Sequence, residues 1–400
     1  MAEPVSLLAD AYLREWLDLL LRWLHVIAGM VWIGTSFYFV ALDSHLRPSR
    51  VEGVAGESWE IHGGGFYRVQ KYRVAPERLP EPLHWFKWEA YTTWLSGFAL
   101  LVVLYYLDAD TYLVDRGVAD LGTGWTVAIS VALLALAWIL YDVLCRLLGA
   151  RQLLLAIALL AFVAAAAYGV SNLFSARAVP IQLGAMLGTM MAGNVLFVII
   201  PGQRELVRAK QAGREPDPAH GIRGKQRSVH NNYLTLPVVL MMIAPHFPFL
   251  YTHERAWIVL LTLMVLGAWI RLFFNLRHQG RTIWTIPVTA AMALFALAVV
   301  IRPEDGSSRA GGAPVPFVRV AAVVEQRCAT CHSAQPTDES FSTAPKGVVL
   351  ESPAQIRAQA AAIEEQAVET KAMPLGNVTG MTDEERALLG RWIDQGAAIP

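Results

Sequence analysis

Residues 125–174 read WTVAISVALLALAWILYDVLCRLLGARQLLLAIALLAFVAAAAYGVSNLF. The stretch contains two apolar runs, 125–145 and 152–174, which are separated by a short turn at Leu147 to Arg151. A helix needs roughly 20 mostly apolar residues to cross the hydrocarbon core of a bilayer, and each run is long enough. The pair therefore predicts two membrane-spanning helices joined by a tight turn.

The same signal recurs along the first three quarters of the chain. Hydrophobic residues make up 55% of the 400 residues and charged residues 16%, whereas soluble domains carry about 25% charged residues. We predict an all-α fold: a polytopic bundle of eight transmembrane helices within residues 1–301. The first run is expected to be a retained helix, because no basic segment precedes it. The six further runs are 17–42, 88–107, 179–201, 232–252, 256–276 and 283–301.

Lysine and arginine are distributed unevenly between the connecting loops. The loops after the first, third and fifth runs hold seven, two and seven of them, whereas the N-terminal tail and the three opposite loops hold four: Arg14, Arg116, Arg177 and Arg255. Positive residues stay on the cytoplasmic side. We therefore expect both chain ends on the periplasmic or outer side of a bacterial inner membrane. The net charge is zero, and no nucleic-acid partner is expected.

The composition changes sharply after the last apolar run. Residues 302–316 are rich in Gly, Ser, Ala and Pro, which is typical of a flexible linker. Residues 317–400 are polar, show helical patterns and contain no apolar run of spanning length. They predict a small soluble all-α domain outside the cytoplasm.

The C-terminal segment contains a C-x-x-C-H motif, Cys328-Ala329-Thr330-Cys331-His332. Such a motif is typical of covalent haem c attachment. Two thiols presented together on a helix add to the two haem vinyl groups, and the histidine ligates the iron. A zinc site or a reactive thiol pair is the alternative, but no further Cys or His follows His332. We predict a class I-like cytochrome c domain with one haem c.

The sixth iron ligand should be a methionine downstream of the motif, because a His/Met pair favours electron transfer. Met381 precedes Thr382-Asp383-Glu384-Glu385, which predicts a capping box at the start of a last helix over about 382–396. Met373 is followed by Pro374 in an irregular stretch. Met373 is therefore the predicted ligand of the iron opposite His332.

Ionisable groups at membrane depth are costly and tend to be functional. His25 lies in the first run and His246 in the outer third of the sixth. The two could ligate a haem b or line a pocket, and the alternative is that each bonds a neighbouring carbonyl.

A second polar group gathers at the predicted cytoplasmic ends. Such residues are ordinary anchors at helix ends, yet amides and imidazoles also suit a planar heterocycle with many donors and acceptors. We single out His84, Glu89 and His230 as candidate bases and Lys87, Asn231, Asn232 and Arg271 as candidate substrate contacts. The long loop before His84 contains the sequence Ile61 to Val69, whose central glycines predict a hairpin.

Several stretches resemble the bacterial membrane-integral urate hydroxylases. They are Arg22-Trp23-Leu24-His25-Val26-Ile27-Ala28-Gly29 with Trp32-Ile33-Gly34, Glu81-Pro82-Leu83-His84-Trp85-Phe86-Lys87-Trp88-Glu89-Ala90, Gly193-Asn194-Val195 with Ile200-Pro201-Gly202-Gln203-Arg204, and His230-Asn231-Asn232-Tyr233. The order of eight spans, linker and terminal cytochrome c is also similar. The resemblance implies oxidation of urate to 5-hydroxyisourate, with water as the oxygen source and electrons leaving through the cytochrome to cytochrome c oxidase or a soluble cytochrome c.

Two other functions remain open at this point. A quinol–cytochrome c type electron-transfer protein, or a membrane-anchored cytochrome that does not act on urate, would have the same spans and the same haem motif. A transporter with a cytochrome tail is a third possibility.

If urate binds at the cytoplasmic ends, haem c lies a bilayer away, roughly 30 Å. Either a second redox centre at His25 and His246 lies between them, or the urate site is nearer the outer face.

Overall fold

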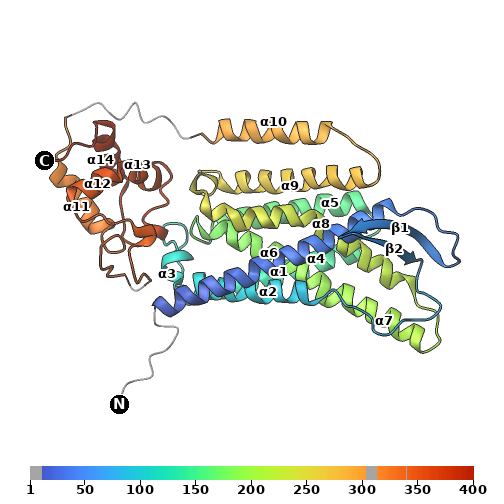
Figure 1. Ribbon diagram of the computed structural model, residues 1–400. Helices are drawn as coiled ribbons and strands as arrows, with labels where there is room; N and C mark the ends of the chain where they lie inside the picture. The colour runs from blue at the N-terminus through green and yellow to red at the C-terminus, as the bar shows by residue number, and fades with distance from the viewer. Residues whose placement is uncertain (1–10, 303–312, 339) are drawn as a thin grey trace, which may run out of the picture.

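The computed structural model describes residues 11–302, 313–338 and 340–400. It is mostly helical and contains a long helix bundle with a smaller helical domain beside one end (Figure 1). We call residues 11–302 the bundle and residues 313–400 the tail domain. Most of the predicted linker, residues 303–312, lies outside the described residues.

Each of the eight predicted runs overlaps a helical rod of the bundle. The rods are α1 (Ala11–His45), α2 (Trp88–Leu101) continued by the π-helical turn η1 (Val102–Tyr106), α4 (Thr123–Leu148), α5 (Gln152–Ser171), α6 (Ala178–Gly193) continued through the π-helical η2 (Asn194–Ile199) into α7 (Ile200–Gln211), α8 (Pro218–Ile243), α9 (Ala256–His278) and α10 (Thr285–Val300). Among the described residues, five of these rods are long and apolar enough to cross a membrane: Tyr12–His45, Thr123–Leu148, Gln152–Ser171, Ala178–Gln211 and Ala256–His278.

The predicted limits of the sixth run, 232–252, were wrong at both ends. Helix α8 begins at Pro218, where the Asp217 side chain accepts a hydrogen bond from the backbone N–H of Ala219 and caps the helix. It continues through the polar residues 219–231, which an apolar pattern does not detect. It ends at Ile243, before Pro245. His246 therefore lies in a 3-10 turn, η3 (Ala244–His246), and not within the helix.

Helix α6 occupies the interior of the bundle. It packs against α2, α4, α5 and α8, and twelve of its 16 residues are buried. The outer rods expose large apolar side chains instead, among them Trp23 (64%), Leu153 (76%) and Phe295 (73%). Apolar surface of this extent on a helix bundle is a sign of a non-aqueous environment or a partner.

The predicted hairpin is confirmed. Strands β1 (Val54–His62) and β2 (Gly65–Tyr72) pair antiparallel, with His62 opposite Gly65 across the turn. Gly63 and Gly64 form that turn with positive φ angles of 56° and 81°, which glycine adopts without steric cost. The hairpin and α7 lie at the end of the bundle opposite the tail domain (Figure 1).

The tail domain is built from short helices around its own apolar core. These are α11 (Phe317–Arg327), α12 (Pro353–Ala358), α13 (Ala360–Ile363) and α14 (Asp383–Asp394). The predicted capping box is present, because Thr382 and Glu385 bond each other's backbone N–H groups. Leu388, Leu389 and Trp392 of α14 face the core, and the Trp392 ring lies 5.9 Å from that of Phe317 in α11.

Candidate functional site

Three consecutive residues of α8 place polar groups inside the bundle. Asn231 and Asn232 are buried and His230 is half-buried. Successive helical residues point about 100° apart, so the three side chains reach different neighbours. His230 and Asn231 face α4 and α6, whereas Asn232 faces α9. The sequence placed Asn232 at the beginning of the predicted sixth run. Because α8 begins at Pro218, Asn232 instead lies near the middle of this helix.

A buried ion pair anchors the first of these neighbourhoods. Arg227 Nη2 donates to Asp142 Oδ1 at 2.6 Å, and Arg227 Nη1 donates to Asn194 Oδ1 at 3.3 Å. The Nδ2 of Asn194 donates to the Oδ1 of Asn231 at 2.8 Å and to the hydroxyl of Tyr141 at 2.9 Å. Asn194 is the first residue of the π-helical turn η2, and such turns are frequent at functional sites.

His230 is held by the same network. Its Nδ1 lies 2.8 Å from the Tyr141 hydroxyl and 3.7 Å from the Cys145 thiol. The Arg227 guanidinium carbon lies 5.0 Å from the centre of the Tyr141 ring. Neither Asp142 nor Arg227 was among the candidate residues singled out from the sequence. The signal for them was Asp142 inside an apolar run, since a buried carboxylate requires a partner.

The second neighbourhood contains hydrogen-bonding groups that are buried without a partner. Asn232 Oδ1 accepts from Arg271 Nε at 3.0 Å and from Asn275 Nδ2 at 2.9 Å. The Asn232 Nδ2, Arg271 Nη2 and Asn275 Oδ1 atoms are buried and have no hydrogen-bond partner within the described residues. Unsatisfied buried polar atoms are rare in folded proteins and require an explanation. We call Asn232, Arg271 and Asn275 the amide–guanidinium cluster.

The cluster has an aromatic wall and an imidazole one turn away. The Arg271 guanidinium carbon lies 3.5 Å from the centre of the Phe37 ring of α1. Arg271, Asn275 and His278 are spaced i, i+4 and i+7 along α9, so that they share one helix face. The Nδ1 of His278 is also buried and has no hydrogen-bond partner among the residues that the structure describes. Asn275 and His278 belong to this site as much as the predicted Asn232 and Arg271.

The predicted residues at the start of α2 lie apart from these contacts. His84 is exposed, and its ring contacts Phe86 edge-on at 4.6 Å. The Lys87 ammonium lies 5.4 Å from the centre of the Trp88 ring. Glu89 differs from both, because its Oε2 is buried and no described residue forms a hydrogen bond with it. Within the part of the chain that the structure describes, no hydrogen bond or ion pair joins any of the three to the amide–guanidinium cluster.

His25 and His246 occupy different environments. The Nδ1 of His25 lies 2.9 Å from the Thr93 carbonyl oxygen and 3.2 Å from the Ser96 hydroxyl, both in α2. Its ring packs so closely on Gly97 that a Cβ there would lie 2.8 Å from His25 Cε1. His246 is exposed in η3. The carbonyl contact predicted as the alternative is therefore present for His25.

The C-x-x-C-H motif lies in a turn and not on a helix, contrary to expectation. Helix α11 ends at Arg327, and the backbone N–H of His332 donates to the Cys328 carbonyl at 2.9 Å, which closes the turn. His332 Nδ1 lies 3.0 Å from the Val348 carbonyl oxygen. When Nδ1–H donates there, the lone pair of Nε2 remains for iron, as in many metal-binding histidines.

The neighbouring groups also fit a haem. Cys328 and Met373 both pack against the apolar core of the tail domain. The backbone N–H of Met373 donates to Gln366 O at 2.8 Å, and Arg386 Nη1 donates to the Met373 carbonyl at 2.6 Å. Burial raises the pKa of the Cys328 thiol to about 11, and burial together with Asp338 does the same for Cys331. As free groups both would be neutral thiols at pH 7.

Within the described ranges, no group of three or more His, Cys, Asp or Glu side chains could hold a metal ion. A haem needs only two axial protein ligands, so this result leaves His332 and Met373 as its candidates.

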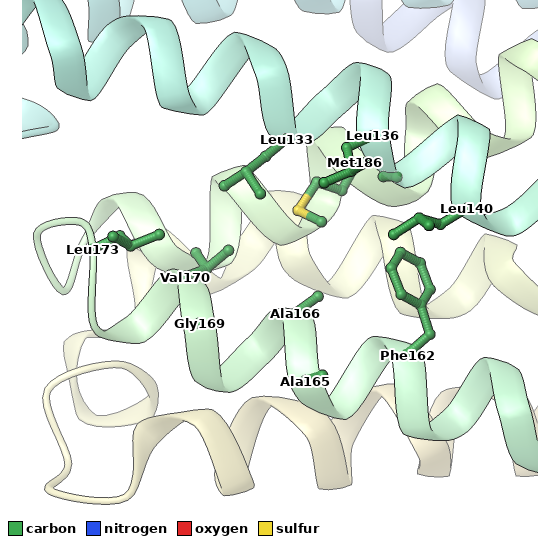
Figure 2. A pocket seen from close by; sticks show the side chains of 11 residues that line it. Leu133, Leu136, Leu140, Phe162, Ala165, Ala166, Gly169, Val170, Leu173 and Met186 are labelled. Carbon is green, nitrogen blue, oxygen red and sulfur yellow. The ribbon is translucent and has the colours of Figure 1, made fainter.

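An apolar cavity of about 120 Å³ lies between α4 and α5 (Figure 2). Figure 2 shows Leu133, Leu140 and Phe162 pointing into the space, with Met186 of α6 behind them. Its lining is aliphatic and aromatic. A ligand that needs several hydrogen bonds would find no partners there, so we exclude this cavity as a site for a polar heterocycle.

The fold and the site together define a mostly helical protein with several apolar helices and a buried cluster of polar groups, some without a partner among the described residues. The model of the family described as urate oxidase N-terminal matches residues 11–302, which is the whole bundle. The chain belongs to this urate oxidase-related family. No curated protein and no solved structure gave a significant match.

Proposed function

We propose that the protein is a membrane-bound urate hydroxylase. Urate and water give 5-hydroxyisourate, two protons and two electrons, and the electrons leave through haem c for the respiratory chain. The observation that carries the proposal is the amide–guanidinium cluster inside a bundle that belongs to the urate oxidase-related family. The C-x-x-C-H motif in the tail domain supports an electron-transfer route in place of oxygen reduction.

The bundle would cross a bacterial inner membrane eight times. The eight helical rods and their exposed apolar side chains support this arrangement. The hairpin and most of α7 belong to the connections 43–87 and 202–231, which hold seven lysines and arginines each. These connections would face the cytoplasm, and the tail domain would lie at the periplasmic end. The division into a urate-oxidising bundle, a linker over 302–316 and a cytochrome c domain over 317–400 is part of this proposal.

The amide–guanidinium cluster has the chemistry that urate requires. Urate is a planar monoanion at neutral pH with carbonyl oxygens and N–H groups around its edge. Asn232 Nδ2 and Arg271 Nη2 would donate to carbonyl oxygens, and Asn275 Oδ1 would accept from an N–H. Arg271 also supplies the positive charge, since guanidinium stays protonated in proteins. The Asn232 Oδ1 bonds hold the three side chains in one fixed arrangement before urate arrives.

Oxidation of urate releases protons, so the reaction requires bases. Glu89 has a buried oxygen without a partner, and His278 has a buried ring nitrogen without one. His230 uses Nδ1 for the Tyr141 hydroxyl. We propose Glu89, His230 and His278 as the groups that accept protons. The exposed position of His84 favours a role at the surface of the bundle.

The tail domain would carry haem c on Cys328 and Cys331, with His332 and Met373 as the axial ligands. Such a haem would accept and donate one electron at a time, and the His/Met ligand pair would raise its reduction potential. The chain's own contribution is to orient these ligands: the Val348 carbonyl fixes the His332 ring, and Arg386 fixes the Met373 backbone.

His25 would be the ligand of a second haem, of type b, inside the bundle. Its Nδ1 contact with the Thr93 carbonyl leaves Nε2 as the ligating atom. His246 is the predicted partner. Pyridine haemochrome analysis of the purified protein is expected to show b-type and c-type spectra, and a c-type spectrum alone would remove this part of the proposal.

One anaerobic experiment tests the main proposal. Urate is added to purified oxidised protein, and the absorption band of reduced haem c is followed. We expect reduction, together with 5-hydroxyisourate as the product and incorporation of oxygen from labelled water. Reduction by a quinol and none by urate would instead show a quinol–cytochrome c type protein. Transport of urate into vesicles without oxidation would show a transporter.

A further inference from the structure

One loop of the tail domain fits tightly against the bundle. The 3-10 turn η8 (Leu375–Asn377) lies against the short helix α3 (Ala109–Tyr112). Gly376 has a φ angle of +55°, and a Cβ on it would lie 3.0 Å from the carbonyl oxygens of both Thr111 and Val114. That separation is closer than an ordinary C–H···O contact of about 3.3–3.6 Å. The contact therefore admits only glycine without displacement.

Two polar contacts flank this approach. The Ser340 and Thr111 hydroxyl oxygens lie 3.4 Å apart, and the Ser342 hydroxyl donates to Glu15 Oε1 of α1 at 2.8 Å. The tail domain is thus fixed to the bundle on α3 and on α1.

The bundle side of the contact is rigidly held. The Ser175 hydroxyl donates to the Tyr112 carbonyl at 2.6 Å, and the Ser175 backbone N–H donates to the Leu113 carbonyl at 2.9 Å. The Arg177 guanidinium carbon lies 5.7 Å from the centre of the Tyr112 ring. These bonds attach α3 to the start of α6, the most buried helix of the bundle.

The tail side of the contact belongs to the loop that carries Met373. Gly376 lies three residues after Met373 in the chain. Asn377 closes this loop, because its Oδ1 accepts from the Met381 N–H at 2.9 Å and its Nδ2 donates to the Met381 carbonyl at 3.1 Å. Arg386 holds the Met373 carbonyl on the other side. A shift of Gly376 would therefore move the Met373 loop as a unit.

We propose that the surface formed by Glu15, Thr111 and Val114 is the docking site through which the bundle delivers electrons to the tail domain. Gly376 is the positioning residue that sets the close approach. The inference rests on the proposed function. Each urate oxidised releases two electrons, which would cross this surface one at a time; a haem c held by the tail domain would pass the first to the downstream oxidase or soluble cytochrome c before it accepts the second.

The docked arrangement is tested first without any turnover. A Thr111→Cys/Ser340→Cys variant of the complete haem-containing protein is treated with a mild oxidant such as copper phenanthroline. We expect a disulfide between positions 111 and 340, detected by peptide mass spectrometry, and none in either single variant. Failure of the double variant to cross-link while it retains the wild-type haem spectrum would overturn the docking site.

The role of Gly376 is tested by a matched pair of variants. Gly347 has a similar positive φ of +68°, but a Cβ there would meet nothing within 4 Å. Gly376→Ala and Gly347→Ala thus share the backbone strain and differ in the contact. Overpacking of this kind shifts an equilibrium by about tenfold or more. We expect Gly376→Ala to lower the cross-linking rate in the cysteine background and to slow urate-driven haem reduction about tenfold, and Gly347→Ala to change neither.

Two controls keep the outcomes apart. The absorption spectrum and reduction potential of haem c should be unchanged in Gly376→Ala, and reduction by dithionite should remain fast.

If the Gly376→Ala protein does not fold, a second variant replaces it. Ser342→Ala removes only the hydrogen bond to Glu15 and should slow urate-driven haem reduction less than Gly376→Ala would. Equal urate-driven reduction rates in Gly376→Ala and wild type would overturn the positioning role. If urate fails to reduce the wild type, the proposed function fails, while the cross-link still decides the docking.

Discussion

Replacement of Asn232 by aspartate separates the structural role of this residue from its proposed role in binding. The Asn232 side chain is fully buried, and its Oδ1 accepts hydrogen bonds from Arg271 and Asn275. Asn232→Asp keeps this acceptor and its shape. It exchanges the unpartnered Nδ2 donor for a negatively charged oxygen at the position where urate would bind.

The expected loss follows from two effects. A hydrogen bond to a charged ligand contributes about 1.5–3 kcal/mol. Repulsion between two unit charges about 5 Å apart is about 3 kcal/mol at an effective dielectric constant of about 20, and the nearby Arg271 offsets part of it. The total of about 3–6 kcal/mol corresponds to a loss of about 10²–10⁴-fold in kcat/KM. The folded state should be nearly unaffected, because both donors to Oδ1 keep their acceptor.

Steady-state urate oxidation and thermal unfolding in detergent measure the two quantities on the same preparations. Asn172→Asp is the control for the change of charge, since Asn172 is exposed at the end of α5. It should retain wild-type kinetics. A kcat/KM for Asn232→Asp within about threefold of wild type, with the protein folded, would refute the assignment of Asn232 Nδ2 to urate.

Three further predictions concern the ion pairs and the iron ligand. Asp142→Ala leaves the buried Arg227 guanidinium without its carboxylate and should cost about 3–5 kcal/mol in the free energy of unfolding. Asp142→Ala/Arg227→Met should recover part of that loss in denaturant titrations, and no recovery would contradict the pairing. Met373→His replaces the thioether ligand and should lower the reduction potential of haem c by on the order of 0.1–0.3 V in a redox titration, whereas Met381→Leu should leave it unchanged. The bidentate hydrogen bonds from Arg327 hold the pKa of Glu385 below its ordinary value of 4.5. This pair therefore stabilises the tail domain above the ordinary carboxyl pKa, by about 1 kcal/mol or less, and the contribution is lost as the pH falls through the lowered pKa. Glu385→Gln should flatten the acid dependence of tail-domain unfolding, and an unchanged pH profile would argue against the pair.

The helices of the bundle were predictable because apolar runs of spanning length leave little choice of structure. The hairpin was predictable because Gly63 and Gly64 interrupt two short strand patterns. Helix α8 was misplaced since its polar first half carries no apolar signal, and its beginning depends on the local Asp217 cap. The position of His246 was wrong for a different reason, because Pro245 ends the helix before the apolar pattern ends.

The candidate site was only partly predictable. His230, Asn231 and Asn232 attracted attention as consecutive polar residues, but their neighbours come from helices far away in the chain. Arg227 pairs with Asp142 across 85 positions, and Asn232 bonds Arg271 across 39. No local pattern encodes such distances, so Arg227 and Tyr141 emerged only when the helices were packed together.

The sequence by itself determined the helical character of the bundle, the separate tail domain and the candidate haem motif. These features depend on local composition and on short fixed spacings, which a linear chain displays directly. Only the tertiary structure decided which polar atoms are buried without partners and where the tail domain touches the bundle. Those properties arise from side chains and backbone carbonyls that become neighbours after packing, as when Gly376 meets the carbonyl oxygens of Thr111 and Val114.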